Sequence, residues 1–292
     1  MKPSSSRAVW LYILTMVIYG SIGVFRRFIP LSSGALAFIR GLVGGVCLLG
    51  FVKLRGGKLF FGLSKRVILL LILSGAMLGI NWMLLFEAYN HTTVAVATLC
   101  YYMQPTFLIL LSPLVFREAL TLRKGLCAAV AVGGMTLVSG VFDGAAAESS
   151  LAGILFGLGA AALYTAIVIL NKKLAVENAY GQTVIQLLSA AAVMVPYLLL
   201  TESACTFPTD PVALLMIAVV GIIHTGVAYA MYFSSIGKLP SQTVAVLGYI
   251  DPVVALLLSA LLLREPMTVW QTAGAVMILL ATAVSEHRSQ HT

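Results

Sequence analysis

The sequence has 292 residues, of which 60% are apolar and only 10% are charged, with a formal net charge of +8. Soluble domains carry about a quarter of charged residues, so this composition excludes a water-soluble globular protein. It also argues against nucleic-acid binding, because the 18 Lys and Arg residues lie in short clusters between apolar runs rather than in a basic stripe interleaved with aromatic residues. We therefore expect an integral membrane protein, most of whose length lies in the lipid bilayer.

Apolar runs long enough to cross the bilayer recur along the whole chain. A hydrocarbon core about 30 Å thick needs about 20 residues of helix. In chain order, the runs predict membrane-spanning helices at 8–25, 34–52, 67–89, 93–116, 124–142, 151–170, 180–200, 212–234, 241–263 and 268–285. The connections between them are short, so we expect no inserted soluble domain.

Basic residues are distributed unevenly between the two sides of the membrane that these spans define. With the N-terminus in the cytoplasm, only Arg26, Arg27 and Arg264 fall in outer loops, and Arg40 falls within a span. All other Lys and Arg residues fall on the cytoplasmic side, as the positive-inside rule requires. The sequence thus predicts a multi-pass protein with both termini in the cytoplasm, in a cell membrane that we expect to be a bacterial inner membrane.

A stretch of the first half of the sequence is repeated 147 residues later. Tyr102-Met-Gln-Pro105 aligns with Tyr249-Ile-Asp-Pro252, and Arg117-Glu118 aligns with Arg264-Glu265. Pro, Arg, Glu and Tyr recur in order, whereas a chance likeness between two Leu-rich helices would match only Leu and Ala. The repetition indicates an internal duplication.

The duplication divides the chain into two units of five spans each, at residues 1–142 and 150–286. Because five is an odd number, the second unit must enter the membrane from the opposite side. The sequence therefore predicts an all-α polytopic membrane protein, with ten transmembrane helices in two inverted five-helix repeats. Inverted repeats are a common architecture of secondary transporters.

These residues carry a resemblance to a known family. The segment YYMQPTFLILLSPLVFREALT and its second copy GYIDPVVALLLSALLLREPMT are similar to the drug/metabolite transporter superfamily, specifically its EamA-type members with two five-helix repeats. FIRGLVGG around Arg40 resembles the second helix of that family. The resemblance covers roughly residues 8 to 286 and implies a secondary active transporter, most simply an exporter of small organic metabolites such as amino acids. It does not specify the substrate.

Polar residues near the middle of the predicted spans mark a candidate binding site. Polar and ionisable groups are unfavourable in hydrocarbon, so they should face a cavity or a partner. Depth along the helices selects Gln104, His224 and Asp251, with Asn81 slightly outward, and the aligned repeats pair Gln104 with Asp251. We predict that the substrate binds at mid-membrane between the two repeats, against Asn81, Trp82, Tyr102, Gln104, His224, Tyr249 and Asp251.

Two of these residues could also couple transport to protons, because Asp251 and His224 can change charge at mid-membrane depth. Each has a structural alternative. Asp251 followed by Pro252 can cap a restarted helix, and His224 can be a neutral residue bonded to the backbone or to a hydroxyl such as that of Thr225.

Other residues near the same spans have open roles. Arg40 and Glu87 could form an ion pair in the outer leaflet or gate the exit path. Aromatic rings at similar depths could contact an organic cation or an apolar substrate body, or could simply pack; they are Tyr19, Tyr101, Tyr164, Tyr229 and Tyr232.

Several function classes remain as alternatives or are disfavoured. A carrier of cationic or choline-like compounds and drugs is the main alternative, and an uncoupled channel-like protein is a lesser one. The sequence has no HExxH or GxSxG motif of a hydrolase and no GxxxxGK[ST] loop of an ATP-driven pump. Its four cysteines have no metal-ligand spacing. We therefore expect no enzyme, cofactor or metal, and as partners a small-molecule substrate, the bilayer and either a proton or a counter-substrate, with the chain acting as a monomer or homodimer.

Overall fold

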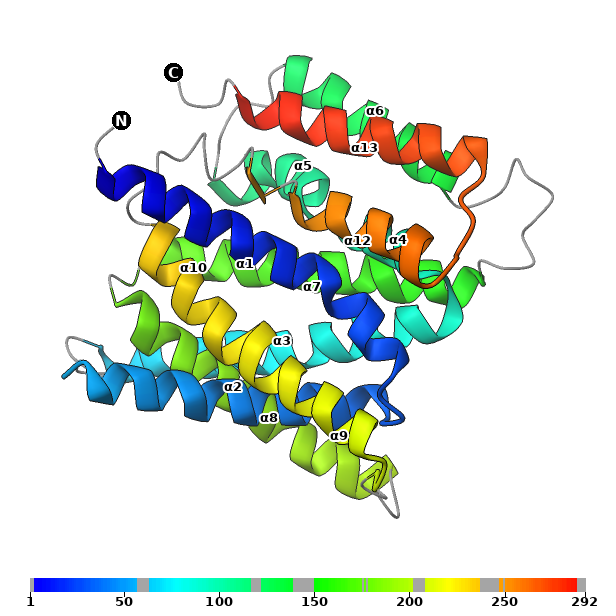
Figure 1. Cartoon of the computed structure of the whole chain (residues 1–292). Helices are drawn as coiled ribbons and strands as arrows, with labels where there is room; N and C mark the ends of the chain where they lie inside the picture. Colours follow the sequence, from blue (N-terminus) through cyan, green and yellow to red (C-terminus); the bar gives the residue numbers. More distant parts are fainter. Residues whose placement is uncertain are drawn as a thin grey trace.

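The computed structural model describes residues 3–56, 63–116, 122–138, 150–174, 176, 178–201, 208–236, 247–248 and 250–287, which form helices and the turns between them (Figure 1). The helices are α1 (Pro3–Arg27), α2 (Ser33–Leu54), α3 (Lys65–His91), α4 (Val94–Tyr101), α5 (Gln104–Phe116), α6 (Leu122–Val138), α7 (Leu151–Leu174), α8 (Ala179–Thr201), α9 (Pro211–Ala218), η1 (Val219–Val227), α10 (Ala228–Ile236), α12 (Ile250–Leu262) and α13 (Val269–His287). The described residues contain no strand, in agreement with the predicted all-α class.

Seven helical stretches in the described chain are long and apolar enough to cross a membrane, and three shorter apolar helices accompany them. The shorter helices, at 125–138, 250–262 and 269–281, overlap the spans predicted at 124–142, 241–263 and 268–285. The all-helical membrane architecture is thus confirmed, while the count of ten spans stays a prediction.

Local sequence determines where several helices begin. The side chains of Ser32, Ser64 and Thr93 accept hydrogen bonds from backbone N–H groups in the first turns of α2, α3 and α4. Asp210 does the same for Ala213 at 2.9 Å, with Pro211 in the first turn of α9. Short polar side chains at these positions satisfy N–H groups that a helix terminus leaves without partners.

Two of the predicted spans are not continuous α-helices. The span at 93–116 is divided into α4 and α5 around Met103, because Pro105 lacks the N–H that a continuous helix would use. The span at 212–234 contains the π-helical segment η1, nine residues long. Such wide turns often mark functional sites.

Small residues allow the closest contacts between helices. Helix α6 packs along α13 at one edge of the bundle (Figure 1). There, Gly134 and Gly274 approach each other reciprocally, since a Cβ added to either one would collide with the backbone oxygen of the other. The contact between the fifth and the last of the predicted spans is therefore close to two-fold symmetric.

Three further contacts between helices of the two halves also occur in equivalent pairs. Helix α3 packs on α7 as α10 packs on α1, and α3 packs on α8 as η1 packs on α2. Likewise α4 packs on α7 as α12 packs on α1. In each pair, helices of the first half and of the second half exchange places. Helix α1 begins and α13 ends at the same end of the bundle (Figure 1).

Candidate functional site

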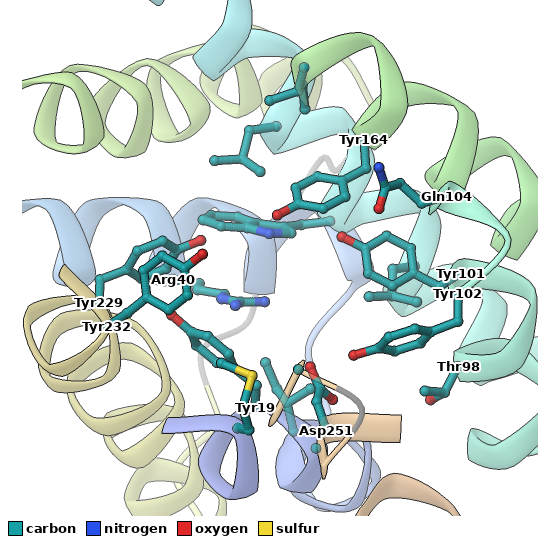
Figure 2. A pocket seen from close by; sticks show the side chains of 18 of the residues that line it. Tyr19, Arg40, Thr98, Tyr101, Tyr102, Gln104, Tyr164, Tyr229, Tyr232 and Asp251 are labelled. Carbon is teal, nitrogen blue, oxygen red and sulfur yellow. The ribbon is translucent and has the colours of Figure 1, made fainter. Parts of the chain in front are cut away.

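A cavity of about 650 Å³ lies in the middle of the bundle, between helices of both halves (Figure 2). Its polar and aromatic lining comes from α1, α2, α3, α4, α5, α7, α8, α10 and α12, and comprises Tyr12, Tyr19, Arg40, Trp82, Tyr89, Thr98, Tyr101, Tyr102, Gln104, Tyr164, Asn171, Gln182, Thr183, Gln186, Tyr229, Tyr232 and Asp251. A cavity of this size, lined by rings and a few polar groups, is typical of a small-molecule site.

The cavity extends toward one end of the bundle and stops short of the other. Its lining includes Asn171 near the end of α7 and Gln182 near the start of α8. Toward the opposite end, the lining stops at Ile22, five residues before α1 ends, and at Arg40, seven residues after α2 begins, although Tyr89 near the end of α3 also contributes.

Beyond Tyr89, a polar cluster joins the two halves. The Glu265 carboxylate lies 2.7 Å from the Arg27 guanidinium and accepts a hydrogen bond of 2.9 Å from the backbone N–H of Val94, at the start of α4. The Ser259 hydroxyl donates to the same carboxylate at 2.6 Å. These contacts connect α1, α4 and α12 and close this end of the bundle.

Tyrosine rings form the cavity wall in two groups. On one side, the Tyr101 ring lies 5.6 Å from Tyr164 and 6.3 Å from Tyr102, between centroids. On the other side, the Tyr19 ring lies 5.9 Å from Tyr229, with Tyr232 beside it (Figure 2). The rings provide apolar area together with hydroxyl groups that can hydrogen-bond a ligand.

Asp251 lies in the first turn of α12 and lines the cavity. Its carboxylate accepts a hydrogen bond from the Tyr102 hydroxyl, which points toward it in Figure 2. A helix N-terminus favours a negative charge. Gln104, the repeat equivalent of Asp251, begins α5 and lines the same cavity. A helix start and a cavity wall therefore coincide at both positions.

Arg40 lies in the cavity wall rather than in an ion pair with Glu87, which corrects the pairing considered from the sequence. Its Nε–H donates to the Thr225 hydroxyl at 3.0 Å, and its guanidinium lies 4.3 Å from the centre of the Trp82 ring. Glu87 instead accepts a hydrogen bond of 2.7 Å from Ser33. Arg40 is seven residues beyond Ser33 on α2, a rise of about 10 Å, so the two charged groups lie at different depths.

Two other predicted site residues pack between helices instead of lining the cavity. Asn81 is fully buried and donates to the backbone oxygen of Ala160 at 2.5 Å. A ring nitrogen of His224 lies 2.9 Å from the Ser21 hydroxyl, and the other lies 3.3 Å from the oxygen of Val219.

The structure thus gathers part of the predicted set. Trp82, Tyr102, Gln104 and Asp251 share one cavity, whereas Asn81 and His224 lie behind its wall and Tyr249 lies outside the described residues.

One polar group of the cavity was not predicted from the sequence. It lies at the end of the cavity that Asn171 and Gln182 line. The Asn171 side-chain oxygen accepts hydrogen bonds from Ser74 at 3.2 Å and from Gln186 at 2.9 Å, and Gln186 donates to Ser74 at 2.7 Å. A search restricted to mid-span polar residues overlooks these positions. Buried polar groups that recur near one end of several spans are the signal that could have found them. In the part of the chain that the structure describes, no cluster of His, Cys, Asp and Glu could hold a metal ion.

A bundle of apolar helices around a polar cavity lined by both halves is typical of a membrane transporter. Comparison with known proteins identifies the family. Residues 6–140 and again residues 151–285 match the model of the EamA-like transporter family. The chain belongs to that family, and the double match shows that it consists of two repeats, as the resemblance in the sequence predicts.

Individual relatives agree with this membership. The chain is 30% identical over 288 residues to the uncharacterized transporter YxxF of Bacillus subtilis (strain 168), covering 98% of this chain and 91% of the relative. It is 28% identical over 197 residues to a protein of Salmonella typhimurium named a probable amino-acid metabolite efflux pump, covering 63% and 64% of the two chains. A crystal structure with 18% sequence identity matches with a TM-score of 0.68 over 96% of both chains, and so has the same fold.

Proposed function

We propose that this protein is a secondary active transporter that exports a small organic metabolite, such as an amino acid, by alternating access of two inverted five-helix repeats. The observation that carries the proposal is the central cavity, whose wall combines residues of both repeats, a carboxylate at Asp251 and a guanidinium at Arg40. A site shared by two repeats can open to either side when the repeats move against each other.

The paired helix contacts support the inverted arrangement of ten spans. If a two-fold axis in the membrane plane relates the repeats, each contact between one helix of the first repeat and one of the second must have a counterpart with the roles exchanged. The three contact pairs described above and the reciprocal approach of Gly134 and Gly274 follow this rule.

The contrast between the two ends of the cavity supports alternating access. The contacts of Glu265 with Arg27 and Val94 close one end, while the lining reaches Gln182 near the other. The distribution of basic residues in the sequence supports an outer location for the end near Glu265 and a cytoplasmic location for the end near Gln182. An exporter collects its substrate from that side.

The choice of an amino acid rests on the relative in Salmonella, whose name refers to amino-acid metabolite efflux, and on the presence of both charge signs in the cavity. The competing candidate is a carrier of cationic or choline-like compounds, which Asp251 and the tyrosine walls favour, since aromatic rings attract organic cations.

The proposal is tested by counterflow. The purified protein is reconstituted into liposomes loaded with a millimolar mixture of unlabelled amino acids, and uptake of each labelled amino acid or of labelled choline at tracer concentration is followed. A carrier gives transient accumulation of label because unlabelled substrate leaves through the same site. We expect accumulation for at least one amino acid.

Two results would overturn the proposal. Counterflow of choline without any amino acid would establish the cation carrier. Equilibration of label without a transient overshoot would indicate the channel-like alternative. Liposomes without the protein serve as the control for flux that bypasses the site.

A further inference from the structure

Arg40 is a buried cation without an acidic partner in the part of the chain that the structure describes. Its exposed fraction is 6%. The ion pairs found among the described residues are those of Glu265 with Arg27 and of Glu87 with His91. A buried charge without an ion-pair partner is strongly unfavourable in a low-dielectric interior. We therefore expect Arg40 to bind a ligand of opposite charge.

The contacts of Arg40 leave one part of its guanidinium available. The Nε–H is used by the Thr225 hydroxyl at 3.0 Å, and one face of the group lies 4.3 Å from the centre of the Trp82 ring. The two terminal nitrogens lie toward the cavity (Figure 2), and no hydrogen bond to them is found among the described residues. Thr225 and Trp82 thus fix the plane of the guanidinium while its outer edge stays free.

We propose that Arg40 is the specificity-determining residue of the transport site, binding a carboxylate of the substrate end-on through its two terminal nitrogens. This inference rests on the proposed function and deepens it. The planar fork of a guanidinium matches the two oxygens of a carboxylate, so a bidentate pair forms with little loss of conformational freedom.

The opposite charge lies elsewhere in the same cavity. Asp251 forms no ion pair with Arg40 among the described residues. The two side chains come from different walls of the cavity (Figure 2), yet they lie close enough for their charges to interact. A cavity with one unpaired cation and one separate carboxylate complements a zwitterion, whose carboxylate binds Arg40 and whose ammonium group binds Asp251. A purely cationic compound leaves Arg40 uncompensated, so the structure favours a zwitterion over a choline-like substrate.

The test compares probes that differ in one charge. Counterflow of labelled leucine is inhibited by unlabelled leucine or by leucinamide, which keeps the ammonium group and lacks the carboxylate. We expect leucinamide to need at least about a ten-fold higher concentration for half-inhibition of the wild-type protein, equivalent to about 1.4 kcal/mol. In Arg40→Gln, we expect the two concentrations to become equal.

Two further variants separate recognition from structure. Arg40→Lys keeps the charge and loses the fork, so the preference for leucine should fall between those of the wild-type protein and Arg40→Gln. Thr225→Val removes the hydroxyl that joins α2 to η1, and it should keep the preference because the terminal nitrogens still face the cavity. If Arg40 had only a structural role, Arg40→Lys and Arg40→Gln would lower transport of all probes and leave the preference unchanged. An unchanged preference in both Arg40 variants, or a wild-type protein that does not distinguish the probes, would overturn the inference.

A binding measurement keeps the inference separate from the proposed function. If the wild-type protein transports no amino acid, the amino-acid proposal fails, but Arg40 can still be tested by thermal unfolding of the purified protein with isovalerate or the neutral isovaleramide. Stabilisation by isovalerate alone, lost in Arg40→Gln, would support the anion site. Equal stabilisation by both compounds, or by neither, would reject it.

Discussion

At the scale of single residues, Asp251 shows how a structural and a chemical role can coincide. It begins a helix beside Pro252, where a short acidic side chain is favourable, and it also lines the cavity and contacts Tyr102. A carboxylate that binds the ammonium group of a substrate can bind a proton instead. Competition between the two ligands for one site would couple export of the substrate to entry of protons.

This coupling predicts different results for Asp251 and His224. In liposomes with an imposed pH gradient, Asp251→Asn should reduce gradient-driven accumulation of substrate to the level measured without a gradient, because its side chain cannot exchange a proton. His224→Gln should retain the gradient effect, because His224 bonds Ser21 and Val219 behind the cavity wall. Loss by His224→Gln alone would move the coupling site to the histidine, and retention by both variants would show that neither residue is the coupling site.

The sequence predicted the positions of site residues along their helices better than the directions in which their side chains point. Depth along a span and the aligned repeats selected Tyr102, Gln104 and Asp251, which share the cavity. The same criterion also selected Asn81, whose side chain turns toward α7 instead. The sequence left Arg40 with two possible roles, an outer ion pair with Glu87 or a gate, because it does not reveal which face of α2 meets η1. In a membrane bundle, the lipid and the protein interior are both apolar, so the hydrophobic periodicity along a helix is weak. The side of a helix that faces the interior is therefore hard to predict from the sequence.

At the scale of helices, the sequence explains the interruption of one span better than that of the other. The break before α5 follows from Pro105, which the sequence places inside the span predicted at 93–116. The π-helical segment η1 has no proline. In η1, the Thr225 hydroxyl donates to the Val220 backbone oxygen at 3.1 Å, five residues earlier, while accepting from Arg40. The hydrogen-bond register of η1 depends on its contacts with α2, and the sequence of η1 alone does not reveal these contacts.

The contact of α6 with α13 gives a matched test of packing. A Cβ at Gly134 would lie 2.7 Å from the Gly274 backbone oxygen, whereas one at the adjacent Gly133 would meet only the end of Met277, at 3.6 Å. Alanine favours a helix over glycine by about 1 kcal/mol at either position. Overpacking at Gly134 costs about 1–3 kcal/mol, so Gly134→Ala should unfold at a lower temperature than Gly133→Ala.

Thermal unfolding of both purified variants in the same detergent provides the measurement. Gly133→Ala should equal or exceed the wild-type protein, because it gains helix propensity without a close contact. Equal unfolding temperatures for the two variants would show that α6 and α13 approach each other less closely than the structure indicates.

At the scale of the whole molecule, the sequence predicted the organisation better than any single contact. Proline, arginine, glutamate and tyrosine recurring 147 residues apart indicated a duplication, and the double family match confirms two repeats. The central position of the cavity follows from this symmetry. What symmetry could not predict is the difference between the repeats, such as Gln104 opposite Asp251 or an arginine at position 40, because a duplicated fold diverges most where it binds its ligand.

The orientation of the two repeats in the membrane provides the last prediction. If each repeat has five spans, the two repeats have opposite orientations, and the distribution of basic residues predicts cytoplasmic termini. In the structure, α1 begins and α13 ends at the same end of the bundle (Figure 1). Reporters fused after Arg66 and after Lys124 should therefore report a cytoplasmic location, and those fused after Glu148 and after Asp210 an external one. The position after Glu148 is decisive because it joins the two repeats. A cytoplasmic signal there would require an even number of spans in the first repeat, which would make the repeats parallel and remove the basis for alternating access by inverted halves.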